Sequence, residues 1–146
     1  MKKFLIFSLI FSQIFIGCGE NSVEKIPQKK IFDLSDAKDG TYTAESSRDE
    51  KLGKSVLTVT IKDKKIIDAK FTGYDLFGNE KNENYGSMLS EGDYKKAQVA
   101  ANAIKNYPVQ LIETQDLNKV DAISGASISY EQFKETAEKI LSEAKK

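Results

Sequence analysis

The sequence contains no histidine and no tryptophan, and only one of its 146 residues is a cysteine. Without an imidazole it cannot build a Ser-His-Asp or Cys-His catalytic group, and it cannot bind zinc or haem through histidine. A single cysteine excludes an internal disulfide, a cysteine-based zinc site and an iron–sulfur cluster within the chain. The 22 basic and 22 acidic residues cancel, whereas nucleic-acid-binding proteins normally carry a basic excess. We therefore expect any reactive group to be bound by this chain rather than built from its side chains.

The first residues have the pattern of a signal peptide. Two lysines precede the apolar run Phe4 to Ile16, which is short for a membrane-spanning helix. The cysteine, Cys18, follows a glycine, and this junction resembles a bacterial lipobox in which Phe15 stands where Leu is usual. We expect residues 1–17 to be a lipoprotein signal peptide, and Cys18 to carry a lipid that anchors the protein on the extracytosolic face of a membrane. An ordinary secretory signal or an uncleaved anchor is the alternative.

The remaining chain divides into a tether and one domain. Residues 1–17 hold two lysines and no acidic residue, so their removal changes the net charge from 0 to −2. Residues 18–38 are polar and lysine-rich and contain Pro27, which is typical of a tether. Residues 39–146 have the length of a single domain with one core.

Strand signals come first in this domain. Asp39-Gly40 predicts a turn, and residues 41–46 are rich in β-forming residues. Residues 56–61 alternate with period two, Asp63-Lys64 predicts the next turn, and residues 66–72 predict a third strand. Short turns between three strands indicate an antiparallel meander.

Helical signals follow the strands, so the predicted fold class is α+β, an antiparallel β-meander followed by helices. Asp93 is the expected N-cap of a first helix, and Tyr107-Pro108 is its expected end. Residues 109–112 fit either another helical turn or an edge strand. In the last helix, residues 129–132 fit a capping box. Its apolar face comprises Phe133, Ala137, Ile140, Leu141 and Ala144.

The segment Asp121-Ala122-Ile123-Ser124-Gly125-Ala126-Ser127 lies directly before this last helix. Its small residues let the backbone approach a bulky group, and amides at a helix N-terminus favour an anion. Two interpretations stay open from the spacing alone. The segment is either a phosphate site, or a helix start at which Ser127 or Ser129 is the cap and Gly125 turns the chain.

The same segment resembles the flavinylation motif of the FMN-binding domain family. In that motif an Asp is followed three residues later by Ser or Thr, then by Gly-Ala and by the hydroxyl residue that accepts FMN. Gly40-Thr41-Tyr42, the meander, Tyr107-Pro108 and Phe133-Lys134 extend the similarity over residues 38–144. The family includes peripheral subunits of sodium-translocating quinone reductases and of ion-pumping ferredoxin oxidoreductases. The chain is most similar to its single-domain flavin lipoproteins of extracytosolic electron transfer.

The resemblance implies which residues bind the cofactor. FMN is expected to be joined covalently, by a phosphoester bond, to Ser127, at a position where Thr is commoner. Asp121, Ser124, Gly125 and Ala126 are implied to form the sequence read by a separate flavin transferase, which uses flavin adenine dinucleotide as donor and binds its own magnesium. No metal site is expected in this chain.

Four further residues are weaker candidates to pack on the flavin ring: Tyr74, Phe77, Tyr85 and Met88. All four lie in or beside the polar loop that follows the strands. Ordinary burial in the core or at a strand end is an equally good explanation for each of them.

The leading hypothesis is therefore a membrane-anchored, extracytosolic electron carrier rather than a stand-alone catalyst. Its expected partners are a flavin transferase, the membrane and unidentified redox proteins, with no nucleic acid. The alternative is a surface lipoprotein that acts as a structural or ligand-binding module without flavin. A hydrolase with Ser127 as nucleophile is disfavoured because the chain has no histidine, and no spacing argument makes Lys119 a base.

Overall fold

The computed structural model describes residues 32–146. The predicted signal peptide, the lipidation site Cys18 and most of the predicted tether lie outside the described residues. The end of that tether packs on the domain, because Leu34 and Ala37 are buried and the Lys38 N–H donates to the carbonyl of Ala144 at 2.8 Å. Within the described part of the chain, no helix is both long and apolar enough to cross a membrane.

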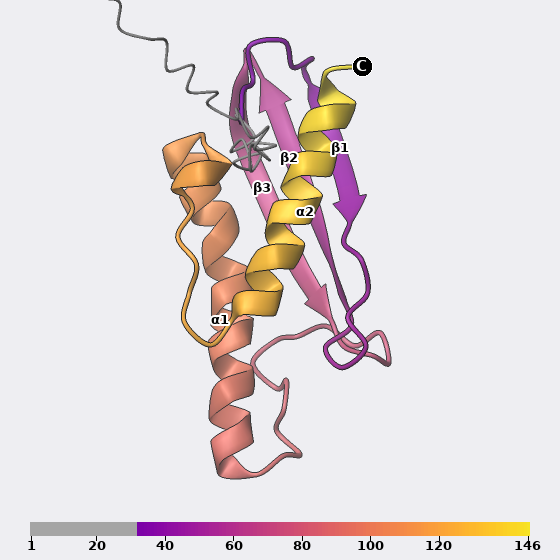
Figure 1. Ribbon diagram of the computed structural model, residues 1–146, viewed down its shortest axis with the longest axis vertical. Coiled ribbons are helices and arrows are strands. Elements are labelled where there is room, and N and C mark those ends of the chain that lie inside the picture. The colour runs from indigo at the N-terminus through magenta and orange to yellow at the C-terminus, as the bar shows by residue number, and fades with distance from the viewer. Residues whose placement is uncertain (1–31) are drawn as a thin grey trace, which may run out of the picture.

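Three antiparallel strands form one sheet in the order β1-β2-β3 (Figure 1). They are β1 (Gly40–Glu45), β2 (Lys54–Lys62) and β3 (Lys65–Tyr74). In β2 every second residue is buried, as the alternation predicted, since one face of the sheet is covered and the other is only partly buried. Asp63 and Lys64, both with positive φ, make the two-residue turn between β2 and β3. The predicted meander is confirmed.

Two helices cover one face of this sheet: α1 (Glu91–Thr114) packs on β3, and α2 (Ser127–Ala144) packs on β1 and β2 (Figure 1). A 3-10 turn, η1 (Leu117–Lys119), follows α1. The predicted α+β class is confirmed. The loops after β1 and β3 lie at the same end of the sheet as the N-terminus of α2 and the first half of α1 (Figure 1).

The predicted limits of the first helix are wrong at both ends. The N-cap is Ser90, whose hydroxyl accepts from the Asp93 N–H at 3.3 Å and donates to the Asp93 carboxylate at 2.8 Å. The helix also continues through Pro108, so residues 109–112 are helical. Pro108 is buried with Tyr107 and Leu111, and this packing offsets the backbone hydrogen bond that a proline removes.

The last helix begins at Ser127, so the predicted capping box at residues 129–132 is wrong. Ser129 and Gln132 are buried on the side of α2 that faces the domain. All five predicted apolar residues of this helix are buried. Phe133 is fully buried, and its ring lies 5.1 Å from the ring centre of Phe71 and 5.4 Å from that of Tyr107. This aromatic cluster joins both helices to the sheet.

Candidate functional site

The segment before α2 is held in place by two tyrosine hydroxyls and one amide. The Tyr130 hydroxyl donates to the carbonyl of Val120 at 3.0 Å, and the Asp121 N–H donates to the side-chain oxygen of Gln110 at 2.8 Å. The Tyr107 hydroxyl accepts from the Ile123 N–H and donates to the Ala126 carbonyl, both at 3.4 Å. Burial raises the pKa of Tyr107, which keeps this hydroxyl protonated as a donor. The backbone before Ser127 is thus tied to both helices.

The backbone conformation and the packing at position 125 both require glycine. Its φ is +85°, in the region that favours glycine, and a Cβ atom there would lie 3.2 Å from Cγ1 of Val99 on α1. Close approach of the segment to α1 therefore depends on a residue without a side chain.

The start of α2 has no side-chain cap. The N-cap is Ala126, and the first helical hydrogen bond runs from the Tyr130 N–H to its carbonyl at 3.0 Å. The N–H groups of residues 127–129 therefore have no acceptor within the helix. The interpretation that Ser127 or Ser129 serves only as the helix cap is thus wrong. What remains is an open helix N-terminus, which attracts an anion, with the exposed hydroxyl of Ser127 beside it.

Ser127 and Ile128 line two cavities. One, of about 350 Å³, lies between the first turns of α2 and residues 47–49 of the β1–β2 loop. The other, of about 240 Å³, lies between the start of α2, Leu52 of the same loop, and Ala100 of α1. Among the described residues, no charged one lines the second cavity, whereas four line the first: Arg48, Asp49, Glu131 and Glu135. Such a pair suits a ligand with one polar end and one flat apolar end.

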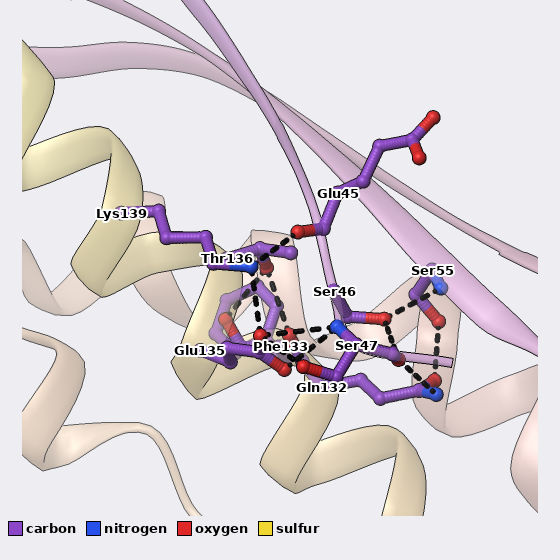
Figure 2. A network of polar contacts seen from close by, with 9 residues as sticks. All are labelled: Glu45, Ser46, Ser47, Ser55, Gln132, Phe133, Glu135, Thr136 and Lys139. Atoms are coloured by element: carbon purple, nitrogen blue, oxygen red, sulfur yellow. Dashed lines mark hydrogen bonds and ion pairs between the residues drawn. The ribbon is translucent and has the colours of Figure 1, made fainter. Parts of the chain in front are cut away.

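A polar network fixes the β1–β2 loop on α2 (Figure 2). The carboxylate of Glu135 accepts the Ser47 N–H at 2.9 and 3.0 Å and the Ser47 hydroxyl at 2.7 Å. It also accepts the Lys139 ammonium at 2.7 Å. Burial raises the pKa of Glu135, but these hydrogen bonds outweigh it and bring the pKa below its ordinary value. Glu135 is therefore ionised at neutral pH and holds the loop as a charged acceptor.

Gln132 anchors the other end of the loop in the interior (Figure 2). Its side-chain oxygen accepts the Ser55 hydroxyl at 2.7 Å, and its amide donates to the Gly53 carbonyl at 2.8 Å. Gly53 itself lies against the backbone of Tyr74 and Asp75, since a Cβ atom there would come within 2.2 Å of the Tyr74 carbonyl oxygen. The loop is thereby fixed to α2 and to the end of β3.

Two residues within the loop complete its shape. The carboxylate of Asp49 accepts the N–H groups of Lys51 at 2.8 Å and Leu52 at 2.7 Å, and these bonds lower the pKa of Asp49. Arg48 donates from Nη2 to the carbonyl of Leu76 at 2.5 Å, which links this loop to the loop after β3.

The sequence-predicted residues of the segment before α2 divide into those that line the two cavities and those that do not. Ser127 lines both cavities, and Gly125 and Ala126 line the second one. Asp121 and Ser124 are exposed and are not among the residues that line them. Leu52, Ala100 and Ile128 line them without having been predicted. No local pattern marks Leu52 or Ala100, because they come from a loop and a helix that only the tertiary fold brings to Ser127.

The weaker aromatic candidates lie elsewhere. Phe77, Tyr85 and Met88 line a third cavity, of about 680 Å³, within the loop between β3 and α1. Phe77 and Met88 are 90% and 96% exposed. Tyr74 is partly buried at the end of β3. None of the four is among the residues that line the two cavities at Ser127.

A buried lysine lies between these regions. Lys81 is 4% exposed, and its ammonium stands 5.5 Å from the centre of the Tyr85 ring. Burial lowers the pKa of Lys81, against the opposing effect of the Asp49 and Asp75 carboxylates. Neither carboxylate forms an ion pair with it among residues 32–146.

Comparison with known proteins identifies the family. The family model described as FMN-binding domain matches residues 51–142. The crystal structure of the CPE2226 protein from Clostridium perfringens is 31% identical, with 74% of this chain and 88% of that chain covered and a TM-score of 0.58. A solution structure from Clostridium thermocellum is 29% identical over 75% of this chain and 93% of that one, with a TM-score of 0.48. A comparison with curated proteins found no match. The chain belongs to the FMN-binding domain family, and FMN is its cofactor.

The residues at Ser127 fit this cofactor. The open N–H groups of α2 and the Ser127 hydroxyl suit a phosphate. Leu52, Ala100 and Ile128 supply the apolar wall that a flat ring system needs.

Proposed function

We propose that this protein is an electron carrier whose FMN is attached through its phosphate to the hydroxyl of Ser127. The observation that carries the proposal is the position of this hydroxyl. It is exposed on the first residue of an uncapped helix, and it lines both the charged and the apolar cavity. Bound flavin supplies the electron chemistry, which explains how a chain without histidine serves a redox function.

The chain's own residues orient and hold the cofactor. The Ser127 Oγ supplies the point of attachment, and the N–H groups of the first turn of α2 stabilise the charge that stays on the phosphodiester. Gly125 allows the segment to lie close to α1, and the hydroxyls of Tyr107 and Tyr130 keep that segment in place.

Attachment requires a partner enzyme. One bond forms between Ser127 Oγ and the flavin-side phosphorus of flavin adenine dinucleotide. The bond from that phosphorus to the bridging oxygen breaks, adenosine monophosphate leaves, and the hydroxyl proton passes to the transferase. Exposed Asp121 and Ser124, beside Ser127 but outside the cavities, are available for the transferase to recognise.

We also propose that the protein works on the extracytosolic face of a membrane, anchored by lipid on Cys18. The basic start, the short apolar run and the Gly-Cys junction support this location. A covalent bond suits such a place, because free FMN lost outside the cytoplasm is not replaced.

The test is coexpression with a flavin transferase followed by mass spectrometry of the intact protein. The expected mass increase is that of FMN minus water, and Ser127→Ala is expected to abolish it. Ser142→Ala is the matched control, because it removes an exposed hydroxyl of the same helix that lies outside both the recognised segment and the cavities. An adduct that persists in Ser127→Ala contradicts the site. A colourless wild-type protein favours the alternative of a ligand-binding or structural lipoprotein.

A further inference from the structure

One cationic side chain lines the two cavities at Ser127 in the described part of the chain, and it is Arg48. Arg48 is also the single arginine of the sequence. It lines the charged cavity of about 350 Å³ together with Ser127. Arginine presents a planar fork of N–H donors that matches phosphate oxygens in pairs, which lysine cannot do.

The acidic residues of this cavity are engaged with other groups. Asp49 accepts two backbone N–H groups, Glu131 pairs with Lys134 at 3.7 Å, and Glu135 binds Ser47 and Lys139. Within residues 32–146, Arg48 makes no ion pair with any of them. A guanidinium without a carboxylate partner is thus left beside an open helix N-terminus.

Arg48 is nevertheless held in position. Its Nη2 donates to the Leu76 carbonyl at 2.5 Å, and the preceding Ser47 is fixed by three hydrogen bonds to Glu135 (Figure 2). The other guanidinium donors remain available. A donor oriented in advance loses less conformational entropy on binding, so it contributes more to affinity than a mobile surface cation.

We propose that Arg48 binds the phosphate of FMN, both when FMN is free and when it is attached to Ser127. This inference rests on the proposed function, since it assigns a binding residue to the same site. It also explains the division of the site, in which the charged cavity receives the phosphate and the apolar cavity receives the ring.

The test compares two flavins that differ in the phosphate. Full-length protein produced without a transferase is titrated with FMN and with riboflavin, which has no phosphate, by quenching of flavin fluorescence. Arg48→Met is expected to weaken FMN binding by about 10- to 100-fold, the range for hydrogen bonds to a charged group, and to leave riboflavin binding unchanged. Arg48→Lys is expected to recover only part of the loss. Lys51→Met is the matched control, because Lys51 is an exposed cation of the same loop that does not line the cavity.

Two outcomes overturn the inference. One is equal FMN affinity in the wild type and Arg48→Met, and the other is equal loss of FMN and riboflavin, which points to a damaged loop. The proposed function is tested separately by the mass of protein coexpressed with the transferase. An adduct on Ser127 with no Arg48 effect leaves the function standing and removes the inference. If FMN is preferred over riboflavin in an Arg48-dependent way but no adduct forms, phosphate binding by Arg48 is supported and attachment to Ser127 is contradicted.

Discussion

Replacing Gln132 by Met tests whether the buried network of Figure 2 holds the site loop in place. Gln132 is 5% exposed and Ser55 is fully buried, so neither side chain can turn to bulk water. Met keeps the length of the side chain but cannot accept the Ser55 hydroxyl, now bonded at 2.7 Å, and cannot donate to the Gly53 carbonyl, now bonded at 2.8 Å. The Gly53 carbonyl keeps a second bond, from the Asp49 N–H at 2.8 Å, so most of the cost falls on the Ser55 hydroxyl.

A buried hydroxyl without a partner costs about 1–3 kcal/mol, and a lost neutral hydrogen bond about 0.5–1.5 kcal/mol. We therefore expect Gln132→Met to lower the free energy of unfolding by about 2–4 kcal/mol, with an unchanged m-value in urea titration. Ser55→Ala alone leaves the Gln132 oxygen without its donor. The double variant leaves neither group unpaired, so it should lose less than the two single variants together.

The expected coupling energy in this double-mutant cycle is about 1–2 kcal/mol. Additivity within about 0.5 kcal/mol would refute the reasoning, because it would show that the two side chains do not depend on each other. A second measurement concerns the site itself. If the network positions Arg48 and Asp49, the rate of FMN attachment in Gln132→Met should fall under conditions where the protein remains folded.

The remaining predictions concern charge and backbone conformation. Glu135→Gln should be less stable than the wild type at pH 7. This difference in stability should disappear as the pH falls below 4.5 and through the lowered pKa of Glu135, because a carboxylate with a depressed pKa contributes stability only while it is ionised. Thermal melts of both proteins across this pH range test the prediction. Lys81→Met should be more stable than the wild type at pH 7, because folding disfavours the charged form of this lysine. The gain in stability should shrink as the pH rises towards 10.5, the ordinary pKa of lysine. A gain that grows with pH would contradict the lowered pKa of Lys81. Gly125→Ala should cost about 1–2 kcal/mol for its positive φ, and adding Val99→Ala should relieve only the contact with α1, which urea titration of the two variants measures.

The sequence predicts the fold where a period is long and uninterrupted. The alternation in β2 and the apolar face of α2 each continue over the whole element, and both were confirmed. The prediction failed at Pro108, because local propensity treats a proline as a stop, whereas burial of Tyr107 and Leu111 carries α1 past it. It failed again at the start of α2, where the sequence favours a capping box at residues 129–132 but the helix begins at Ser127 with an alanine as its N-cap.

The site could be predicted only as far as it is continuous in sequence. Gly125 and Ser127 could be predicted as candidate site residues because one short segment contains them both. Arg48 and Leu52 come from a loop more than 70 positions earlier in the sequence. The residues around them show no periodic pattern that would identify them as site residues. Their place depends on the register of β1 with β2 and on hydrogen bonds from α2, which are properties of the assembled fold.

The two parts of α2 have different roles. From Gln132 onward its inward face is buried against the sheet and stabilises the domain. Its first turn has only Ser129 buried and lacks the side-chain cap that α1 has in Ser90, a device that typically contributes about 1 kcal/mol. The fold can leave these N–H groups open because the hydroxyls of Tyr107 and Tyr130 hold the preceding segment from outside the helix. A cap at this point would occupy donors that the proposed phosphate site uses. Under this proposal, the missing cap is a cost in stability that keeps the site open.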